Sequence, residues 1–116
     1  MHGFPIFGLQ IHDRVDEAKE LYREMAQDTS EFYVVRGLFH QGYIHHFMED
    51  NIDSARYYYE SALQTEPRHV QSWHNLGICY DQEGNKTQAL KAFSKALKYD
   101  PKFELSRVYA DSIRFL

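Results

Sequence analysis

Histidine is the residue of this sequence best suited to chemistry, because its imidazole binds metals and transfers protons near neutral pH. The chain has seven histidines, and His40, His45 and His46 share one predicted helix while His74 falls on another. Ligands on one helix are usually three or four residues apart, because that spacing puts both side chains on one face. Here the separations are five and one, so we predict no bound metal and no other cofactor.

The motifs of common enzyme classes are absent from the sequence. We find no glycine-rich phosphate loop, no nucleophile elbow, no paired-cysteine motif and no His-Glu-x-x-His stretch. Cys79 is the only cysteine, which rules out an intrachain disulfide, and its apolar surroundings "LGICY" predict a buried thiol in a reducing compartment. The sequence therefore predicts a protein that is not an enzyme.

Three adjacent tyrosines in "SARYYYESAL", residues 54–63, are the other feature that suggests a binding site. Successive residues on a helix point about 100° apart, so Tyr57, Tyr58 and Tyr59 cannot all face one core. Either the run is a recognition patch or its members have different roles.

Length and charge limit the classes of partner. A chain of 116 residues is one domain, and its net charge of −4 gives no reason to expect nucleic acid. The start "MHGFPIFGLQ" lacks the basic residues of a signal peptide, and no window approaches the roughly 18 apolar residues of a membrane span. We expect an intracellular, cytoplasmic location, with an organelle interior as the alternative.

The elements that position these residues follow from an internal repeat, in which similar residues recur at one fixed spacing more often than chance allows. The matching pairs are Asn51 and Asn85, Ala55 and Ala89, Tyr59 and Phe93, Ala62 and Ala96, and Pro67 and Pro101. All five pairs have the same separation along the chain, which we call the repeat period.

Residues 68–101 resemble the tetratricopeptide repeat (TPR), whose pattern is W-x2-L-G-x2-Y, then A-x3-F, then P, with the same period. The resemblance implies an all-α solenoid of helical hairpins, with about three repeats, the first degenerate, and a C-terminal capping helix. The residues that carry the pattern in this chain are Ala55, Tyr59, Ala62, Pro67, Trp73, Leu76, Gly77, Tyr80, Ala89, Phe93, Ala96 and Pro101.

The repeat divides the single domain, residues 1–116, into four parts. These parts are a degenerate repeat (1–29), a repeat with a long first helix (30–67), a well-formed repeat (68–101) and a capping helix (102–116). The expected helices lie near 13–27, 30–48, 52–65, 68–83, 86–99 and 102–114. In the second of them Tyr43 stands where the family has a small residue and Gly42 comes one step early. Either this helix is rotated or one residue is accommodated near "MED".

A third, degraded copy of the pattern opens the chain. Phe4, Phe7, Gly8 and Ile11 have the spacing of the first-helix stripe, and Ala18, Tyr22 and Met25 have the spacing of the second-helix stripe. A helix over about 13–27 follows from the second stripe, and an earlier helix is the weaker expectation.

The repeat alignment separates the three tyrosines. Tyr59 aligns with Phe93 and is predicted to be buried, Tyr58 is expected to pack between helices, and Tyr57 aligns with the solvated Lys91. Tyr57 is therefore expected on the outer side of the solenoid, where it is either incidental or contacts a neighbour.

The resemblance also implies a binding groove, because first helices of TPR repeats line a concave surface that holds a peptide or a partner helix. The groove residues implied by alignment are His40, Gln41, Ile44, Phe47, Met48, Gln71, His74, Asn75, Ile78, Asp81 and Gln82. Family members that hold a C-terminal carboxylate do so with Lys, Asn and Arg side chains. Only Asn75 matches here, since His40, Leu105 and Tyr109 occupy the basic positions, and this type of groove is disfavoured.

Two functions remain after these exclusions, and both have another protein as the partner. The first is a scaffold or structural subunit of a larger assembly, favoured by the apolar start of the chain and by the last helix, which carries apolar residues on more than one side. Self-association through these apolar ends is included in this reading. The alternative is an adaptor that binds an extended segment or a helix in the groove.

Overall fold

The computed structural model describes residues 9–27 and 30–114, with side chains described from residue 14 onward. Within these residues the chain forms α-helices and one π-helical turn, and no β-strand. The elements are α1 (Leu9–Ala26), α2 (Glu31–Tyr43), the π-helical turn η1 (Ile44–Met48), α3 (Ile52–Thr65), α4 (Val70–Gln82), α5 (Lys86–Tyr99) and α6 (Glu104–Arg114).

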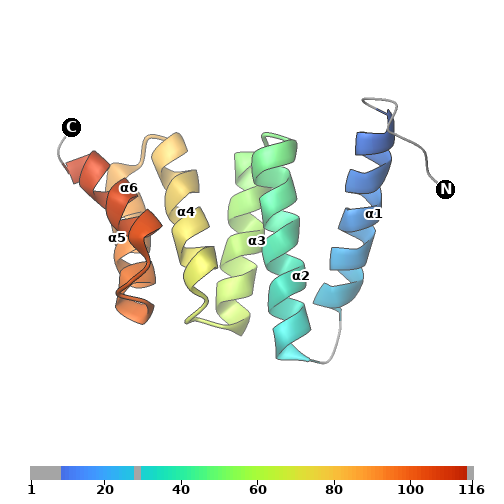
Figure 1. The fold of residues 1–116 in the computed structure, drawn as a ribbon, viewed down its shortest axis with the longest axis horizontal. Coiled ribbons are helices and arrows are strands. Elements are labelled where there is room, and N and C mark those ends of the chain that lie inside the picture. Colours follow the sequence, from blue (N-terminus) through green and yellow to red (C-terminus); the bar gives the residue numbers. More distant parts are fainter. Residues whose placement is uncertain (1–8, 28–29, 115–116) are drawn as a thin grey trace.

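Consecutive helices pack against one another along the chain, from α1 at one end to α6 at the other. Figure 1 shows this row of helices, with α1 at one end of the long axis and α5 and α6 at the other. Helices α2 and α3 form one hairpin, and α4 and α5 form the next. The all-α architecture of stacked helical hairpins is therefore confirmed.

Asparagine caps start the second helix of each hairpin. The side chain of Asn51 accepts a hydrogen bond from the Ser54 backbone N–H at 3.2 Å, and Asn85 accepts one from Gln88 at the same distance. Such a cap satisfies an otherwise unpaired donor and contributes about 1 kcal/mol to helix stability. Both helices, α3 and α5, have the bounds that the repeat pattern predicts.

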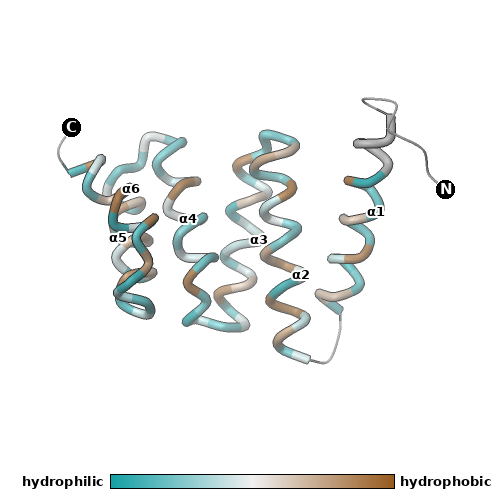
Figure 2. The backbone as a smooth tube through the Cα atoms, viewed as in Figure 1, coloured by the Kyte–Doolittle hydropathy of each residue, from teal (hydrophilic) through white to brown (hydrophobic). Residues whose placement is uncertain are grey.

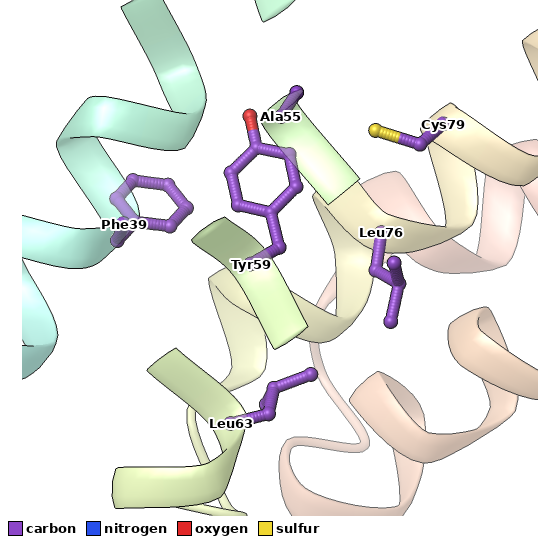
Figure 3. Close-up of a cluster of buried hydrophobic side chains, with 6 residues drawn as sticks. All are labelled: Phe39, Ala55, Tyr59, Leu63, Leu76 and Cys79. Carbon is purple, nitrogen blue, oxygen red and sulfur yellow. The ribbon is translucent and has the colours of Figure 1, made fainter. Parts of the chain in front are cut away.

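Tyr59 is the largest side chain of the first core cluster and is fully buried. Its ring centroid lies 5.7 Å from that of Phe39 on α2. Figure 3 shows the Tyr59 ring between Phe39 on one side and Leu76 and Cys79 of α4 on the other. Phe93 has the same place in the second cluster and is also fully buried. The equivalent aromatic residues of the two repeats, Tyr59 and Phe93, thus each lie at the centre of one hairpin.

A glycine on each first helix allows it to touch the aromatic ring of its own second helix. A Cβ atom on Gly77 would lie 2.6 Å from Cε1 of Phe93, and one on Gly42 would lie 2.7 Å from Cε1 of Tyr59. Both distances are too short for any larger side chain. Gly42 therefore takes the small-residue position of the repeat, and Tyr43 is half exposed beside it.

The π-helical turn η1 explains why Gly42 comes one residue early. The interval from Gly42 to Tyr59 is one residue longer than the interval from Gly77 to Phe93. The backbone N–H of Glu49 donates to the carbonyl oxygen of Ile44, five residues back, at 3.1 Å. A π-helical turn accommodates one extra residue in an α-helix. Of the two sequence interpretations, the added residue is the right one.

The three tyrosines have three different environments. Tyr59 is buried. Tyr58 is partly buried, and its ring stacks on His45 with the ring centroids 5.3 Å apart and an angle of 4° between the ring planes. Tyr57 is 64% exposed. Helical geometry thus separates the roles of adjacent, identical residues.

The N-terminal copy differs from its prediction where the structure describes it. Helix α1 begins at Leu9, so Ile11 lies in α1 and not in a separate earlier helix. The remaining residues of the proposed first stripe, Phe4, Phe7 and Gly8, lie outside the described residues. Ala18, Tyr22 and Met25 are half-buried on α1.

Helix α1 approaches α2 closely at Gly37. A Cβ atom there would lie 2.6 Å from the backbone nitrogen of Ala26 and would also meet the carbonyl oxygen of Tyr22. Small buried residues recur at the matching positions of the next two first helices, namely Ser72 and Ser106, both fully buried. Ser72 and Ser106 are one repeat period apart, and the step from Gly37 to Ser72 is longer by the extra residue of η1.

Figure 2 shows apolar and polar positions interspersed along each helix. Among the described residues, no helix combines the length and apolar character that crossing a bilayer requires.

We predict that Phe93→Ala destabilises the fold by roughly 3 to 5 kcal/mol, because it leaves a cavity between paired helices. Urea unfolding followed by circular dichroism measures the change, with the exposed Ser94→Ala on the same helix as the control. Gly77→Leu is expected to be at least as severe, since Phe93 fills the space. A loss for Phe93→Ala as small as that of the control would contradict the packing described above.

A matched pair of substitutions tests the hairpin turns. Gly84 has φ +82°, and Asp50, at the matching position of the preceding repeat, has φ 51°, so both lie in the left-handed region. A side chain costs about 1 kcal/mol there. We expect Gly84→Ala to lower the free energy of unfolding by about 1 kcal/mol and Asp50→Gly to raise it or leave it unchanged. Equal destabilisation by both would show that backbone conformation does not govern these turns.

Candidate partner-binding surface

The first helices of the hairpins meet through a contact that recurs once per repeat. At the first junction, the Phe39 ring lies edge-on to His69, with centroids 5.4 Å apart. At the next junction His74 meets Phe103 in the same way at 5.2 Å. Phe103 follows His69 by one repeat period, and His74 follows Phe39 by one period plus the extra residue of η1. The two junctions are therefore equivalent in position. The first pairs a phenylalanine on the earlier helix with a histidine at the start of the next one, and the second pairs them the other way round.

The third member of this series is Val108 on α6, one repeat period after His74. No described residue covers it, and it is 61% exposed. Leu105, one turn earlier on α6, is 57% exposed. The opposite face of α6 is packed, with Ser106 and Ala110 buried. We name the exposed pair Leu105 and Val108 the α6 end face, because Val108 occupies the place where each earlier first helix contacts the next one and Leu105 lies beside it.

Polar residues lie where α6 would face a second helix of its own. In the 68–101 repeat, Gly77 touches Phe93 of α5, Tyr80 packs against the cluster that contains Phe93, and the Trp73 ring centroid lies 5.8 Å from Nζ of Lys95 on α5. The matching positions of α6 are Arg107, Asp111 and Arg114, all exposed. Helix α6 therefore lacks the residues that form a hairpin contact. Among its described residues, the large apolar side chains that are exposed are those of the α6 end face.

The other end of the array has an apolar cleft of about 410 Å³ between α1 and the α2–η1 helix. Tyr43, Phe47 and Met48 are each about half exposed near it, and the rings of Tyr43 and Phe47 are 4.8 Å apart. The residues that line the cleft are Arg14, Val15, Ala18, Tyr22, His40, Tyr43, Ile44 and Met48. An apolar cleft of this size is within the range of ligand and peptide sites.

Between these ends, a buried hydrogen-bond chain joins η1, α3 and α4. Asn75 donates from Nδ2 to the hydroxyl oxygen of Tyr59 at 3.3 Å. The Tyr59 hydroxyl lies 3.1 Å from Nδ1 of His46, whose Nε2 lies 2.7 Å from the side-chain oxygen of Gln82. One neutral tautomer satisfies all four groups, with Tyr59 donating to Nδ1 and Nε2–H donating to Gln82. Burial lowers the pKa of His46, which favours this neutral form.

Two further titratable groups in the core are held neutral by burial. Nδ1 of His74 lies 2.8 Å from the hydroxyl of Ser106, and burial lowers the pKa of His74 to about 4. Burial raises the pKa of the Cys79 thiol to about 12, and the cysteine is fully buried. A thiol with such a high pKa is a poor nucleophile near neutral pH.

The eleven residues of the predicted groove divide into two groups. Five are buried, namely Gln41, Ile44, His74, Asn75 and Ile78, and a sixth, Gln82, is exposed but bonds to the buried His46. The other side chains, which are at least partly open, are His40, Phe47, Met48, Gln71 and Asp81. Of these, Asp81 is paired with Lys86 at 2.9 Å. The open apolar members, Phe47 and Met48, thus gather at the α1 end and not along α4.

The histidines whose side chains the structure describes do not form a metal site. Among the described residues, no group of three or more His, Cys, Asp or Glu side chains is arranged to hold a metal ion. His45 stacks on Tyr58, and its Nδ1 lies 2.9 Å from Oε1 of Glu49. Glu49 also pairs with Lys19 of α1, and this pairing lowers the pKa of the Glu49 carboxyl.

Sequence reasoning missed the α1 side of the apolar cleft and the burial of His46. The cleft had a signal, since Val15, Ala18 and Tyr22 follow one helical stripe. The burial of His46 had none, because it depends on the extra residue in η1. Gly37, Ser72 and Ser106 were a further unused signal of close helix packing.

Stacked hairpins joined by equivalent junctions define a helical-repeat protein, a class whose members present extended surfaces to other macromolecules. The TPR family model, described as tetratricopeptide repeat, matches residues 70–103. Together with the fold and the relatives given below, this match makes the chain a TPR domain protein and a protein–protein interaction module. The TPR is generally a non-enzymatic fold.

Curated relatives agree with this family. The chain is 28% identical over 88 residues to the tetratricopeptide repeat domain-containing protein PYG7, chloroplastic, of Arabidopsis thaliana, which covers 76% of this chain and 27% of that protein. It is 30% identical over 99 residues to the general transcriptional corepressor trfA of Dictyostelium discoideum, and the match covers 84% of this chain and 7% of that protein. It is 33% identical over 78 residues to tetratricopeptide repeat protein 6 of Homo sapiens, and the match covers 66% of this chain and 14% of that protein. The chain thus matches about a quarter or less of the length of these relatives.

We predict that acid weakens the fold through His74. The unfolded imidazole has a pKa near 6.5 and the folded one about 4, so the unfolded state binds more protons between these values. The contribution of the neutral His74 to the free energy of unfolding is therefore fully present above about pH 6.5, and it is lost as the pH drops toward 4. From about pH 7 to about pH 5, His74 alone accounts for about 2 kcal/mol.

Urea unfolding at the two pH values measures this loss, and His74→Gln is expected to be less stable at pH 7 and less sensitive to pH. NMR titration of the His74 imidazole gives its folded pKa directly. A variant with the pH dependence of the wild type would assign the effect to other groups.

Proposed function

We propose that this chain is a scaffold or structural subunit that joins a larger assembly through its α6 end face. The observation that carries the proposal is the junction series. Phe39 and His74 each contact the start of the following first helix, whereas the third member, Val108, is exposed. Exposed apolar residues on a position built for helix contact are typical of a protein interface. The partner is a helix supplied by a neighbouring subunit or by another copy of the chain.

The charge pattern of α6 supports a partner helix over a further hairpin of the same kind. Arg107, Asp111 and Arg114 stand where the preceding repeat has its hairpin contacts, and they are exposed. Arg107 pairs with Glu104 and Arg114 with Asp111, so a second helix packed there would take these exposed ion pairs out of water, at a high desolvation cost. The partner helix therefore approaches the Val108 side of α6.

The groove adaptor is the second candidate, and the α1–α2 cleft favours it. This cleft is apolar, about 410 Å³ in volume, and bordered by Tyr43 and Met48. An extended or helical segment with two apolar anchors fits such a site. A carboxylate-clamp receptor is disfavoured, because Asn75 is 8% exposed and donates to Tyr59. On this proposal the groove ligand contacts Phe47 and Met48 and not α4.

The compartment and the internal division of the chain are further parts of this proposal. We keep the cytoplasm as the expected location, and the chloroplastic name of one relative makes an organelle interior the main alternative. The four parts, 1–29, 30–67, 68–101 and 102–116, remain the proposed repeat organisation. Neither assumption affects the test of the end face.

We predict that the double variant Leu105→Lys with Val108→Lys loses its protein partners and any self-association, while its melting temperature stays within a few degrees. Both residues are mostly exposed, so the substitution costs the fold little. Asp111→Lys on the same helix is the control, because it changes the charge by the same two units. Tagged chains are recovered from cells, and the copurified proteins are compared by quantitative mass spectrometry. Light scattering of the purified chains reports self-association.

The expected result is at least a tenfold loss of the partner proteins for the double variant and no loss for Asp111→Lys. Full retention of these proteins by the double variant would exclude the end face. Loss in Phe47→Lys with Met48→Lys, but not in the α6 variant, would instead support the groove adaptor.

A further inference from the structure

A second cleft lies on the other side of the array from the groove, between the second helices α3 and α5. Helix α4 packs against both of them and forms the floor. The cleft has a volume of about 690 Å³, within the range of ligand and peptide sites. Its lining residues are Tyr57, Glu60, Ser61, Leu63, Gln64, Trp73, Leu76, Tyr80, Gln88, Lys91, Ala92 and Lys95.

The floor is apolar and rigidly held. Trp73, Leu76 and Tyr80 follow one stripe of α4 and point between α3 and α5. The indole N–H of Trp73 donates to the carbonyl oxygen of Pro67 at 2.7 Å, which fixes the orientation of the ring. Trp73 and Tyr80 pack against the first core cluster but remain partly open to the cleft. The floor thus offers aromatic surface that needs no rearrangement before binding.

The α5 wall is positively charged. Lys91 and Lys95 are one turn apart and exposed, and neither forms an ion pair with a carboxylate of the described residues. Lys95 instead holds its ammonium 5.8 Å from the centroid of the Trp73 ring. Many other cations of the described chain are neutralised, as in the pairs of Arg56 with Glu83 and of Lys86 with Asp81. This wall therefore carries unneutralised positive charge in a protein of net charge −4.

The α3 wall is mainly polar and carries the most exposed tyrosine. Tyr57 is 64% exposed and lies on the rim of the cleft. Glu60 is the only carboxylate in the lining, and it accepts a weak hydrogen bond from the Tyr80 hydroxyl at 3.5 Å. The cleft is thus asymmetric, with cations on one wall, an aromatic rim on the other and an apolar floor.

We propose that this cleft binds a short acidic segment of a partner protein, with apolar side chains on the floor and carboxylates toward Lys91 and Lys95. Charge complementarity selects the acidic residues, and Tyr57, Trp73 and Tyr80 supply the aromatic contact area. Glu60 lies across the cleft from the lysines and opposes a uniformly charged polyanion, which favours a peptide over a nucleic acid. The site is independent of the α6 end face and goes beyond the scaffold function.

The test uses the whole chain and short peptides from a displayed library that contains no tryptophan. Trp73 is the only tryptophan of the protein and lies in the floor, so its fluorescence reports occupancy of the cleft directly. The charge-reversal variant is Lys91→Glu with Lys95→Glu. Its control is Lys98→Glu with Lys102→Glu, which changes the net charge equally at exposed positions outside the lining. Tyr57→Ala tests the rim.

We expect the selected peptides to combine acidic and large apolar residues, to change the Trp73 emission, and to bind the charge-reversal variant at least tenfold more weakly. The control variant is expected to bind within about twofold of the wild type, and Tyr57→Ala about threefold to tenfold more weakly. Equal binding to the charge-reversal and control variants would overturn the proposal. So would selection of peptides that lack acidic residues, no selected peptide, or tighter binding of a single-stranded oligonucleotide at the same residues.

Discussion

Each hairpin depends on direct contact between a glycine backbone and an aromatic ring. Gly42 meets Tyr59 and Gly77 meets Phe93, at distances that leave no room for even a methyl group. The contact fixes how close the two helices of a hairpin lie and buries the ring completely. Once the rings are placed, the outward faces of both helices are set by helical periodicity. The exposed faces of the hairpins therefore follow from a packing constraint at two glycines.

The extra residue in η1 is the one departure from this regular plan, and the polar core depends on it. The π-helical turn keeps Gly42 against Tyr59 and brings His46 to the Tyr59 hydroxyl. The second hairpin has Phe93 in the matching place, and this ring carries no hydroxyl that needs a partner. A buried hydroxyl without a partner would cost about 1 to 3 kcal/mol, so a tyrosine at this position requires the chain of bonds that η1 completes.

Three open surfaces of the described chain differ in chemical character. The α6 end face is apolar, the α1–α2 cleft is apolar with a half-buried histidine, and the α3–α5 cleft is aromatic and positively charged. Their separation matters, because a subunit held through α6 still has its two clefts available. Tyr57 lies on the rim of the α3–α5 cleft, because its position on α3 faces outward.

Spacing along the chain was sufficient to predict the helices, the hairpin partners and the buried aromatic pair. Helices α3 and α5 have their predicted bounds because their asparagine caps and apolar stripes are local signals. Exposure of the groove residues could not be obtained in this way, because Asn75 and Gln82 are satisfied by partners on other helices, far away along the chain. The period of the sequence fixes which side chains share a face of a helix, whereas burial depends on which distant helix covers that face. Only the packed structure decides that, because a hydrogen bond or ring contact across a junction requires both chain segments to be in place.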